Sequence, residues 1–262
     1  MGTNNQKQVK KSKRGGVSSA ILILGCGIVA FVFFFGYCGH EMHFDAKGHP
    51  INGNIFGTLF QGGWVIPIVM TLLLTVVALS IERAFALNRA KGKGNLFKFV
   101  EGVVTKIDAN DLDGARKLCD AQKGSAANIL TSALLRYEDI EGQDLSNDEK
   151  ASLVRKEIED ATTLELPAME QNMNIIAAIS TLGTLMGLFG TVLGMIKSFG
   201  AMGQEGAPDS TALAIGISEA LMNTAMGIGT GALAIISYTY FSGKIQNVTN
   251  AVDEIGFAIG QS

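Results

Sequence analysis

Residues 179–199 have the sequence I-S-T-L-G-T-L-M-G-L-F-G-T-V-L-G-M-I-K-S-F. This segment is apolar enough to cross a membrane, yet small and hydroxyl-bearing residues recur along it. On a helix, five such positions fall within roughly 60° of one another: Ser180, Thr184, Gly187, Thr191 and Ser198. Lipid gives no reason to place these residues on one stripe. The stripe therefore indicates either tight packing between helices or an ion path.

Glycines recur in the same segment, at Gly183, Gly187, Gly190 and Gly194. A helix without side chains at such positions lets a neighbouring helix approach closely. We therefore expect helix packing at Gly187, Gly190 and Gly194, and also at Gly227 in the next apolar segment.

The composition is that of an integral membrane protein. Of the 262 residues 47% are hydrophobic, and they gather in long runs without charge. The formal net charge of −3 offers no case for nucleic-acid binding. The three cysteines, Cys26, Cys38 and Cys119, are odd in number and scattered, so they predict neither a disulfide framework nor a metal site.

The three histidines share one short loop, at His40, His43 and His49. A metal site is conceivable because His40 and His43 are three residues apart. No cysteine and no second acidic cluster accompanies them, so we favour a solvated loop and expect neither metal nor cofactor.

The N-terminal part contains two predicted spans. Residues 1–16 form a basic tail, and residues 17–38 are an uncharged apolar run long enough to cross a bilayer. No small-x-small cleavage site follows this run, which favours a retained anchor over a signal peptide. Residues 39–63 form a polar, glycine-rich loop, and residues 64–86 are the second span.

The basic flanks predict the orientation. The tail and the lysine-rich segment after Arg83 lie on the same side if two spans separate them. The positive-inside rule places that side in the cytoplasm, so the loop 39–63 is expected in the periplasm and both termini in the cytoplasm.

Residues 87–170 are soluble in character and predict a helical cytoplasmic domain. Short amphipathic helices are expected at 96–107, 112–121 and 126–137. Ser146 and Glu149 form a capping box that begins a long helix towards the membrane. Pro167 should kink or briefly interrupt this helix.

The C-terminal part contains two more spans, at 171–199 and 211–241, joined by a periplasmic turn at 200–210. Residues 242–262 continue as an amphipathic helix that should pack on the cytoplasmic helices. The predicted fold is thus an all-α integral membrane protein with four spans, whose long helices extend into a helical cytoplasmic domain.

Glu219 is the acidic residue placed well inside a predicted span. A carboxylate is costly there, so it should be paired, protonated or facing a cavity. Asn223, Thr230 and Ser237 share its helix face, whereas Thr224 lies on another. Glu219 is therefore either a hydrogen-bonded strut between helices or part of a proton path.

Two segments of the sequence resemble motifs of a known family. Residues 187–194 have the sequence G-L-F-G-T-V-L-G, and residues 219–227 have E-A-L-M-N-T-A-M-G. They resemble the GLFGTVxG and EALxxTAxG motifs of the ExbB/TolQ branch of the MotA/TolQ/ExbB family, in the right order and separation. Residues 81–83, I-E-R, resemble the family's span-ending motif. The resemblance covers roughly residues 64–245, and the anchor at 17–38 departs from the usual three spans.

The resemblance implies an inner-membrane proton channel. Similar proteins assemble as pentamers around partner helices of the ExbD or TolR type, which supply a protonatable aspartate. Thr191 and Thr224 match the family's pore-lining threonines, and Glu219 matches its last-span glutamate. Threonine hydroxyls can hydrogen-bond a carboxylic acid on a central helix.

These observations predict an ExbB-like subunit that uses the proton motive force to move a TonB-like protein for outer-membrane transport. A TolQ-like subunit for envelope integrity and a non-conducting membrane scaffold remain as alternatives. An enzyme is not expected, because no nucleophile–base pair or phosphate loop is found.

Overall fold

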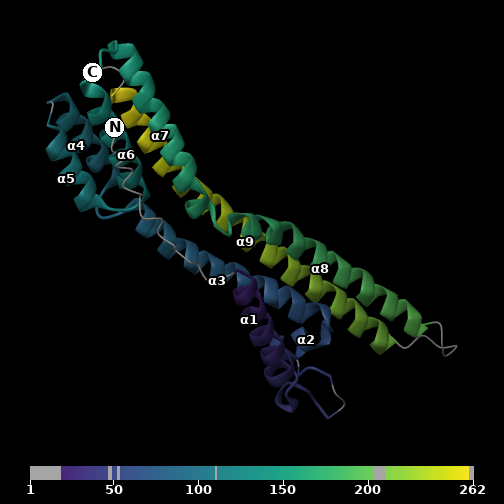
Figure 1. The fold of residues 1–262 in the computed structure, drawn as a ribbon. Coiled ribbons are helices and arrows are strands. Elements are labelled where there is room, and N and C mark those ends of the chain that lie inside the picture. Colours follow the sequence, from purple (N-terminus) through teal and green to yellow (C-terminus); the bar gives the residue numbers. More distant parts are fainter. Residues whose placement is uncertain (1–18, 47–48, 52–53, 110, 203–209, 260–262) are drawn as a thin grey trace.

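The protein is a long assembly of helices, described here by a computed structural model for residues 19–46, 49–51, 54–109, 111–202 and 210–259 (Figure 1). Four helices within these residues are long and apolar enough to span a membrane, at Ser19–Cys38, Val65–Ile107, Met173–Gly200 and Leu213–Glu254. The predicted all-α membrane fold with four spans is therefore confirmed. The basic tail 1–16, the first two residues of the anchor and residues 203–209 of the expected periplasmic turn lie outside the described residues.

Two helices form the N-terminal part of the membrane region. Helix α1 (Ser19–Val32) continues into a π-helical turn, η1 (Phe33–Cys38), and packs against α3 (Val65–Lys91). Pro67 lies in the first turn of α3, where its missing N–H costs little. In Figure 1 α1 lies in the lower part of the view, and α3 runs from beside α1 and α2 up to the helical bundle.

The segment 39–63, expected to be a polar loop between the first two spans, contains a short helix that the sequence analysis did not predict. Helix α2 (Ile55–Gln61) follows the 3-10 turn η2 (Glu41–His43). The Asn54 side chain caps α2 by accepting hydrogen bonds from the N–H groups of Phe56 and Gly57. Buried Leu59 packs α2 against Phe34 of η1 and Ile66 of α3.

The histidines of this segment do not form a common site. His43 is buried, lies against the rings of Tyr37 and Phe56, and its Nδ1 is 2.8 Å from Asn54 Nδ2. Within the described residues, no group of three or more His, Cys, Asp or Glu side chains could hold a metal ion.

A helical bundle occupies the other end of the molecule. It consists of α4 (Leu96–Asp108), α5 (Leu112–Gln122), α6 (Ser125–Glu141) and α7 (Asn147–Glu170), which confirms the predicted helices. The capping box at Ser146 and Glu149 is present. The predicted C-terminal stripe also packs here, because Val248 and Val252 are buried in the same apolar cluster as Ile158.

The helix break near the membrane is not where proline predicted it. Helix α7 passes through Pro167 without ending and stops at Glu170. The chain then turns through Gln171 and Asn172, and α8 (Met173–Met202) begins. The φ of Asn172 is 65°, which lies in the left-handed region. The interruption expected at Pro167 therefore occurs a few residues later, between Glu170 and Met173. By contrast, α9 (Ser210–Ile259) runs unbroken from the membrane region into the bundle, alongside α8 and then α7 (Figure 1).

Candidate functional site at the contact of helices α8 and α9

Glycines bring the backbones of α8 and α9 together. A Cβ atom added to Gly227 would lie 2.5 Å from the Cα of Gly187, and one added to Gly187 would lie 2.9 Å from the Cα of Gly227. Real Cβ atoms do not come so close to backbone, so any side chain at either position would push the helices apart. The two glycines therefore define the point of closest approach.

The other two glycines of the predicted packing set face α9 as well. A Cβ at Gly190 would lie 2.5 Å from the side chain of Asn223, and one at Gly194 would lie 3.0 Å from Ala220. Gly187, Gly190 and Gly194 thus lie on the face that α8 turns to α9, and Gly227 lies opposite them on α9.

Thr191 and Thr224 meet across this contact. Their hydroxyl groups hydrogen-bond each other. Thr191 Oγ1 also lies 3.1 Å from the carbonyl oxygen of Gly187, and both hydroxyls lie 3.3 Å from that of Ala220. The two residues are 33 positions apart in sequence and are joined because the glycines let the helices approach closely.

The hydrogen-bonding capacity of this pair follows from its proton count. Each hydroxyl has one proton, so one threonine donates to the other, and the second donates to a carbonyl oxygen. Lone pairs remain on both oxygens, and both residues are half-buried. The pair can therefore accept a hydrogen bond from a neutral carboxylic acid as it stands. To donate to a charged carboxylate, a hydroxyl must first rotate away from its present acceptor.

Glu219 lies five residues before Thr224 on α9 and is paired with a lysine. Its Oε2 is 2.8 Å from Lys197 Nζ, which comes from α8. The Glu219 side chain is 11% exposed and that of Lys197 68%, so the lysine covers the carboxylate from outside. The structure brings Glu219 to the same helix contact as the threonines, but bonds it to neither of them.

The end of α2 closes this site from a third direction. The Asn223 amide donates a hydrogen bond of 3.0 Å to the carbonyl oxygen of Gly62, while its own buried Oδ1 has no partner among the described residues. The adjacent Gly63 has a φ of 74°, and a Cβ there would lie 2.7 Å from Glu219 Oε1. Backbone therefore seals the carboxylate where a side chain would not fit.

Sequence reasoning missed Lys197 and the Gly62–Gly63 turn. Lys197 stands in the quoted segment, but its pairing depends on the rotation of α8 against α9, which periodicity does not predict. The two glycines carry the usual signal of a turn, yet nothing local indicates that the turn lies on α9.

A sequence model of the MotA/TolQ/ExbB proton channel family matches residues 122–254. The chain is 31% identical over 169 residues to a protein named ExbB-like 3 from Synechocystis sp., an alignment that covers 64% of this chain and 75% of that protein.

Two further relatives match over shorter stretches. One is the Tol-Pal system protein TolQ of Haemophilus influenzae, 32% identical over 100 residues, which are 36% of this chain and 43% of TolQ. The other is the biopolymer transport protein ExbB of Salmonella typhimurium, 34% identical over 77 residues, which are 29% of this chain and 32% of that ExbB. The matches therefore span less than half of either relative.

Proposed function

The chain belongs to the MotA/TolQ/ExbB proton channel family, and on this basis we propose that it is an ExbB-type subunit of a proton channel in the bacterial inner membrane. In this proposal the channel uses the proton motive force to move a TonB-like protein, which energises outer-membrane transport. The relatives named ExbB and ExbB-like support this assignment.

The hydroxyl pair of Thr191 and Thr224 is the observation that carries the proposal. Both threonines lie where α8 and α9 are closest, and they can accept from a neutral carboxyl or donate to a charged one. A partner helix of the ExbD or TolR type would present an aspartate to this pair. Protonation of the aspartate would then decide which hydrogen bond forms, and so which position the partner helix takes.

The proposed assembly is a homopentamer around the partner helices, with both termini in the cytoplasm. Its support is the apolar surface left on α8 and α9. Leu185, Leu188, Val192 and Ile196 form one stripe on α8, each more than half exposed. Lipid or neighbouring subunits can cover such a stripe, whereas its exposure to water would be unfavourable in free energy.

The test replaces only the hydroxyl groups. Thr191→Val and Thr224→Val keep the shape nearly constant, and each removes a hydrogen bond to a charged group, worth on the order of 1.5–3 kcal/mol. A step that depends on the bond should slow roughly ten- to a hundredfold. We expect both variants to assemble but to support little growth on a substrate that needs active outer-membrane import.

Thr230→Val is the matched control. Thr230 is also buried on α9, but its hydroxyl donates only to Met226 of its own helix, at 2.8 Å. Parent-like growth of the Thr191 and Thr224 variants would exclude the proposed pore. The level of the complex is measured by blotting. If the variants lose the complex itself, the threonines are packing residues of a scaffold.

A TolQ-like role in envelope integrity is the second candidate, because TolQ of Haemophilus influenzae is as similar to this chain as ExbB is. The gene should be expressed in cells that lack either ExbB or TolQ. Restored import supports the first role, and restored detergent resistance supports the second.

A further inference from the structure

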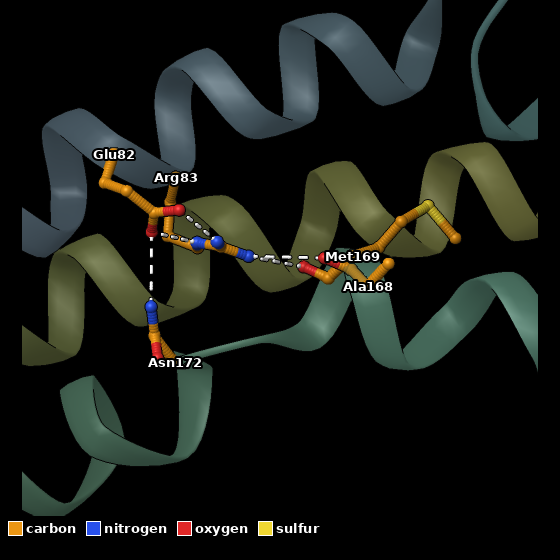
Figure 2. Close-up of polar contacts among 5 residues, drawn as sticks. All are labelled: Glu82, Arg83, Ala168, Met169 and Asn172. Atoms are coloured by element: carbon orange, nitrogen blue, oxygen red, sulfur yellow. Dashed lines mark hydrogen bonds and ion pairs between the residues drawn. The ribbon is translucent and has the colours of Figure 1, made fainter. Parts of the chain in front are cut away.

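A buried charged cluster connects α3 to the break between α7 and α8 (Figure 2). Arg83 of α3 is 1% exposed and forms a two-pronged ion pair with its neighbour Glu82, with Nε 2.7 Å from Oε2. Arg83 Nη1 donates to the carbonyl oxygens of Met169 at 3.3 Å and Ala168 at 3.5 Å. Asn172 Nδ2 donates to Glu82 Oε2 at 3.4 Å.

These bonds fall on the groups that a broken helix leaves without partners. The last four carbonyl oxygens of an α-helix accept no hydrogen bond from the helix itself. Ala168 and Met169 contribute two of those at the end of α7, where the negative end of the helix dipole also favours a cation. Arg83 therefore does what water would do at an exposed helix end.

The other side of the break is held by Asn172. Its left-handed backbone makes the turn, and its carbonyl oxygen accepts from the N–H groups of Ile175 and Ile176 at the start of α8. Its side chain reaches back to Glu82 (Figure 2). One pair of neighbouring residues on α3 thus grips the end of one helix and the beginning of the next.

The two residues between α7 and α8 are not helical, so α7 alone does not dictate the rotation of α8 about its axis. Thr191 lies on α8 at roughly 28 Å from the break. We propose that Glu82 and Arg83 are positioning residues, which hold the start of α8 at the rotation that brings Thr191 to Thr224. The importance of that position rests on the proposed function, but the position itself can be measured separately.

The measurement is disulfide formation between α8 and α9. Thr191→Cys and Thr224→Cys are introduced into a chain with Cys26→Ala, Cys38→Ala and Cys119→Ala, and oxidation is followed in the full complex in membranes. The hydroxyls of the parent residues touch, so the thiols should cross-link within one chain. Arg83→Met should slow cross-linking about tenfold, the factor that corresponds to losing one charged hydrogen bond. Arg83→Lys should recover part of the rate, because lysine keeps the charge but not the fork.

Asn172 provides variants that leave Arg83 in place. Asn172→Gly keeps the left-handed turn but loses the amide that bonds to Glu82, so it should slow cross-linking measurably, though by less than Arg83→Met does. Asn172→Asp also tolerates the turn but repels Glu82, and it should slow cross-linking as much as Arg83→Met does. Adding Glu82→Gln to Asn172→Asp restores a donor–acceptor pair and should restore the rate. Lys106→Met, which breaks an exposed ion pair with Asp111, is the control that should change nothing.

The outcomes separate this inference from the proposed function. Parent-like cross-linking in both Arg83→Met and Asn172→Asp overturns the positioning role, whatever the proton flow. If Arg83→Met does not accumulate, Asn172→Asp and its Glu82→Gln rescue decide, and an unaffected rate in Asn172→Asp overturns it. If cross-linking slows but the same substitutions in a chain with native threonines leave import intact, the positioning role stands and the pore role of the threonines fails.

Discussion

At the scale of single residues, Lys197 explains how Glu219 can lie inside an apolar helix. A carboxylate there needs a partner, and the lysine supplies one across the helix contact at 2.8 Å. The pair is asymmetric, because the Glu219 side chain is enclosed while the Lys197 side chain remains largely exposed. Removing the lysine should therefore cost more than removing both charges together.

We expect Lys197→Met to lower the stability of the complex by on the order of 1–3 kcal/mol, because it leaves an enclosed charge without a partner. Glu219→Gln should cost less, since its amide can still accept from Lys197 or donate to nearby backbone. The double variant should be more stable than Lys197→Met alone. Thermal melting of the purified complexes checks the order, and additive losses would show that the two residues are not coupled.

The same residues mark the limit of prediction at this scale. Glu219, Thr191 and Thr224 stood out in the sequence because of residue type, helix face and motif. Neither the Thr191–Thr224 bond nor the Lys197–Glu219 pair could be predicted, because each joins side chains on different helices. Asn223 shares the helix face of Glu219, yet its amide bonds to the Gly62 carbonyl.

At the scale of elements, backbone contact between α8 and α9 makes one glycine indispensable and another dispensable. A Cβ at Gly227 would collide with the backbone of Gly187, whereas a Cβ at Gly229, two residues on, meets nothing within 4 Å in the part of the chain that the structure describes. Gly227→Ala should destabilise the protein by about 1–3 kcal/mol through overpacking. Gly229→Ala should be neutral or stabilise it by about 0.5–1 kcal/mol, because alanine favours a helix.

Thermal melting of the two variants provides the comparison. Both variants add one methyl group to the same helix, so they differ only in what that methyl group meets. Equal melting temperatures for Gly227→Ala and Gly229→Ala would show that the close approach of α8 and α9 contributes nothing to stability.

Long and strongly patterned elements could be predicted, whereas short elements and breaks could not. The spans follow from apolar length, and the start of α7 follows from the capping box of Ser146 and Glu149. Helix α2 was missed because its seven residues are too few to show a period, although Asn54 is a typical cap. The break was expected at Pro167 but occurs at Asn172, since Arg83 of a distant helix stabilises the carbonyl groups exposed there.

At the scale of the whole molecule, the orientation in the membrane can be tested by labelling. Exposed Met42 should be periplasmic and exposed Gln143 cytoplasmic if both termini lie in the cytoplasm. In a Cys26→Ala and Cys38→Ala chain, Met42→Cys should react with an impermeant thiol reagent in spheroplasts, and Gln143→Cys only after the membrane is opened. Labelling of Gln143→Cys in intact spheroplasts would contradict the orientation.

Native Cys119 can remain in that experiment. Burial raises the pKa of its thiol to about 11, so it carries almost no thiolate at neutral pH, and it is 2% exposed. Only the thiolate reacts. The Cys26→Ala and Cys38→Ala chain without an introduced cysteine should therefore stay unlabelled, whichever side of the membrane the reagent reaches. This supplies the background against which the two introduced cysteines are compared.

The unbroken course of α9 has a consequence for how such a chain can change its length. Thr224 meets α8 in the membrane region and Val248 packs in the helical bundle, and only continuous helix joins them. Each inserted residue would turn one of these faces by about 100° relative to the other, whereas seven would leave them within about 20°. Insertions and deletions between the two residues should therefore be tolerated best at lengths that bring the two faces back into line, such as about 7, 11 or 18 residues. The turn at Gln171 and Asn172, by contrast, lets the neighbouring α7 and α8 change length independently of each other.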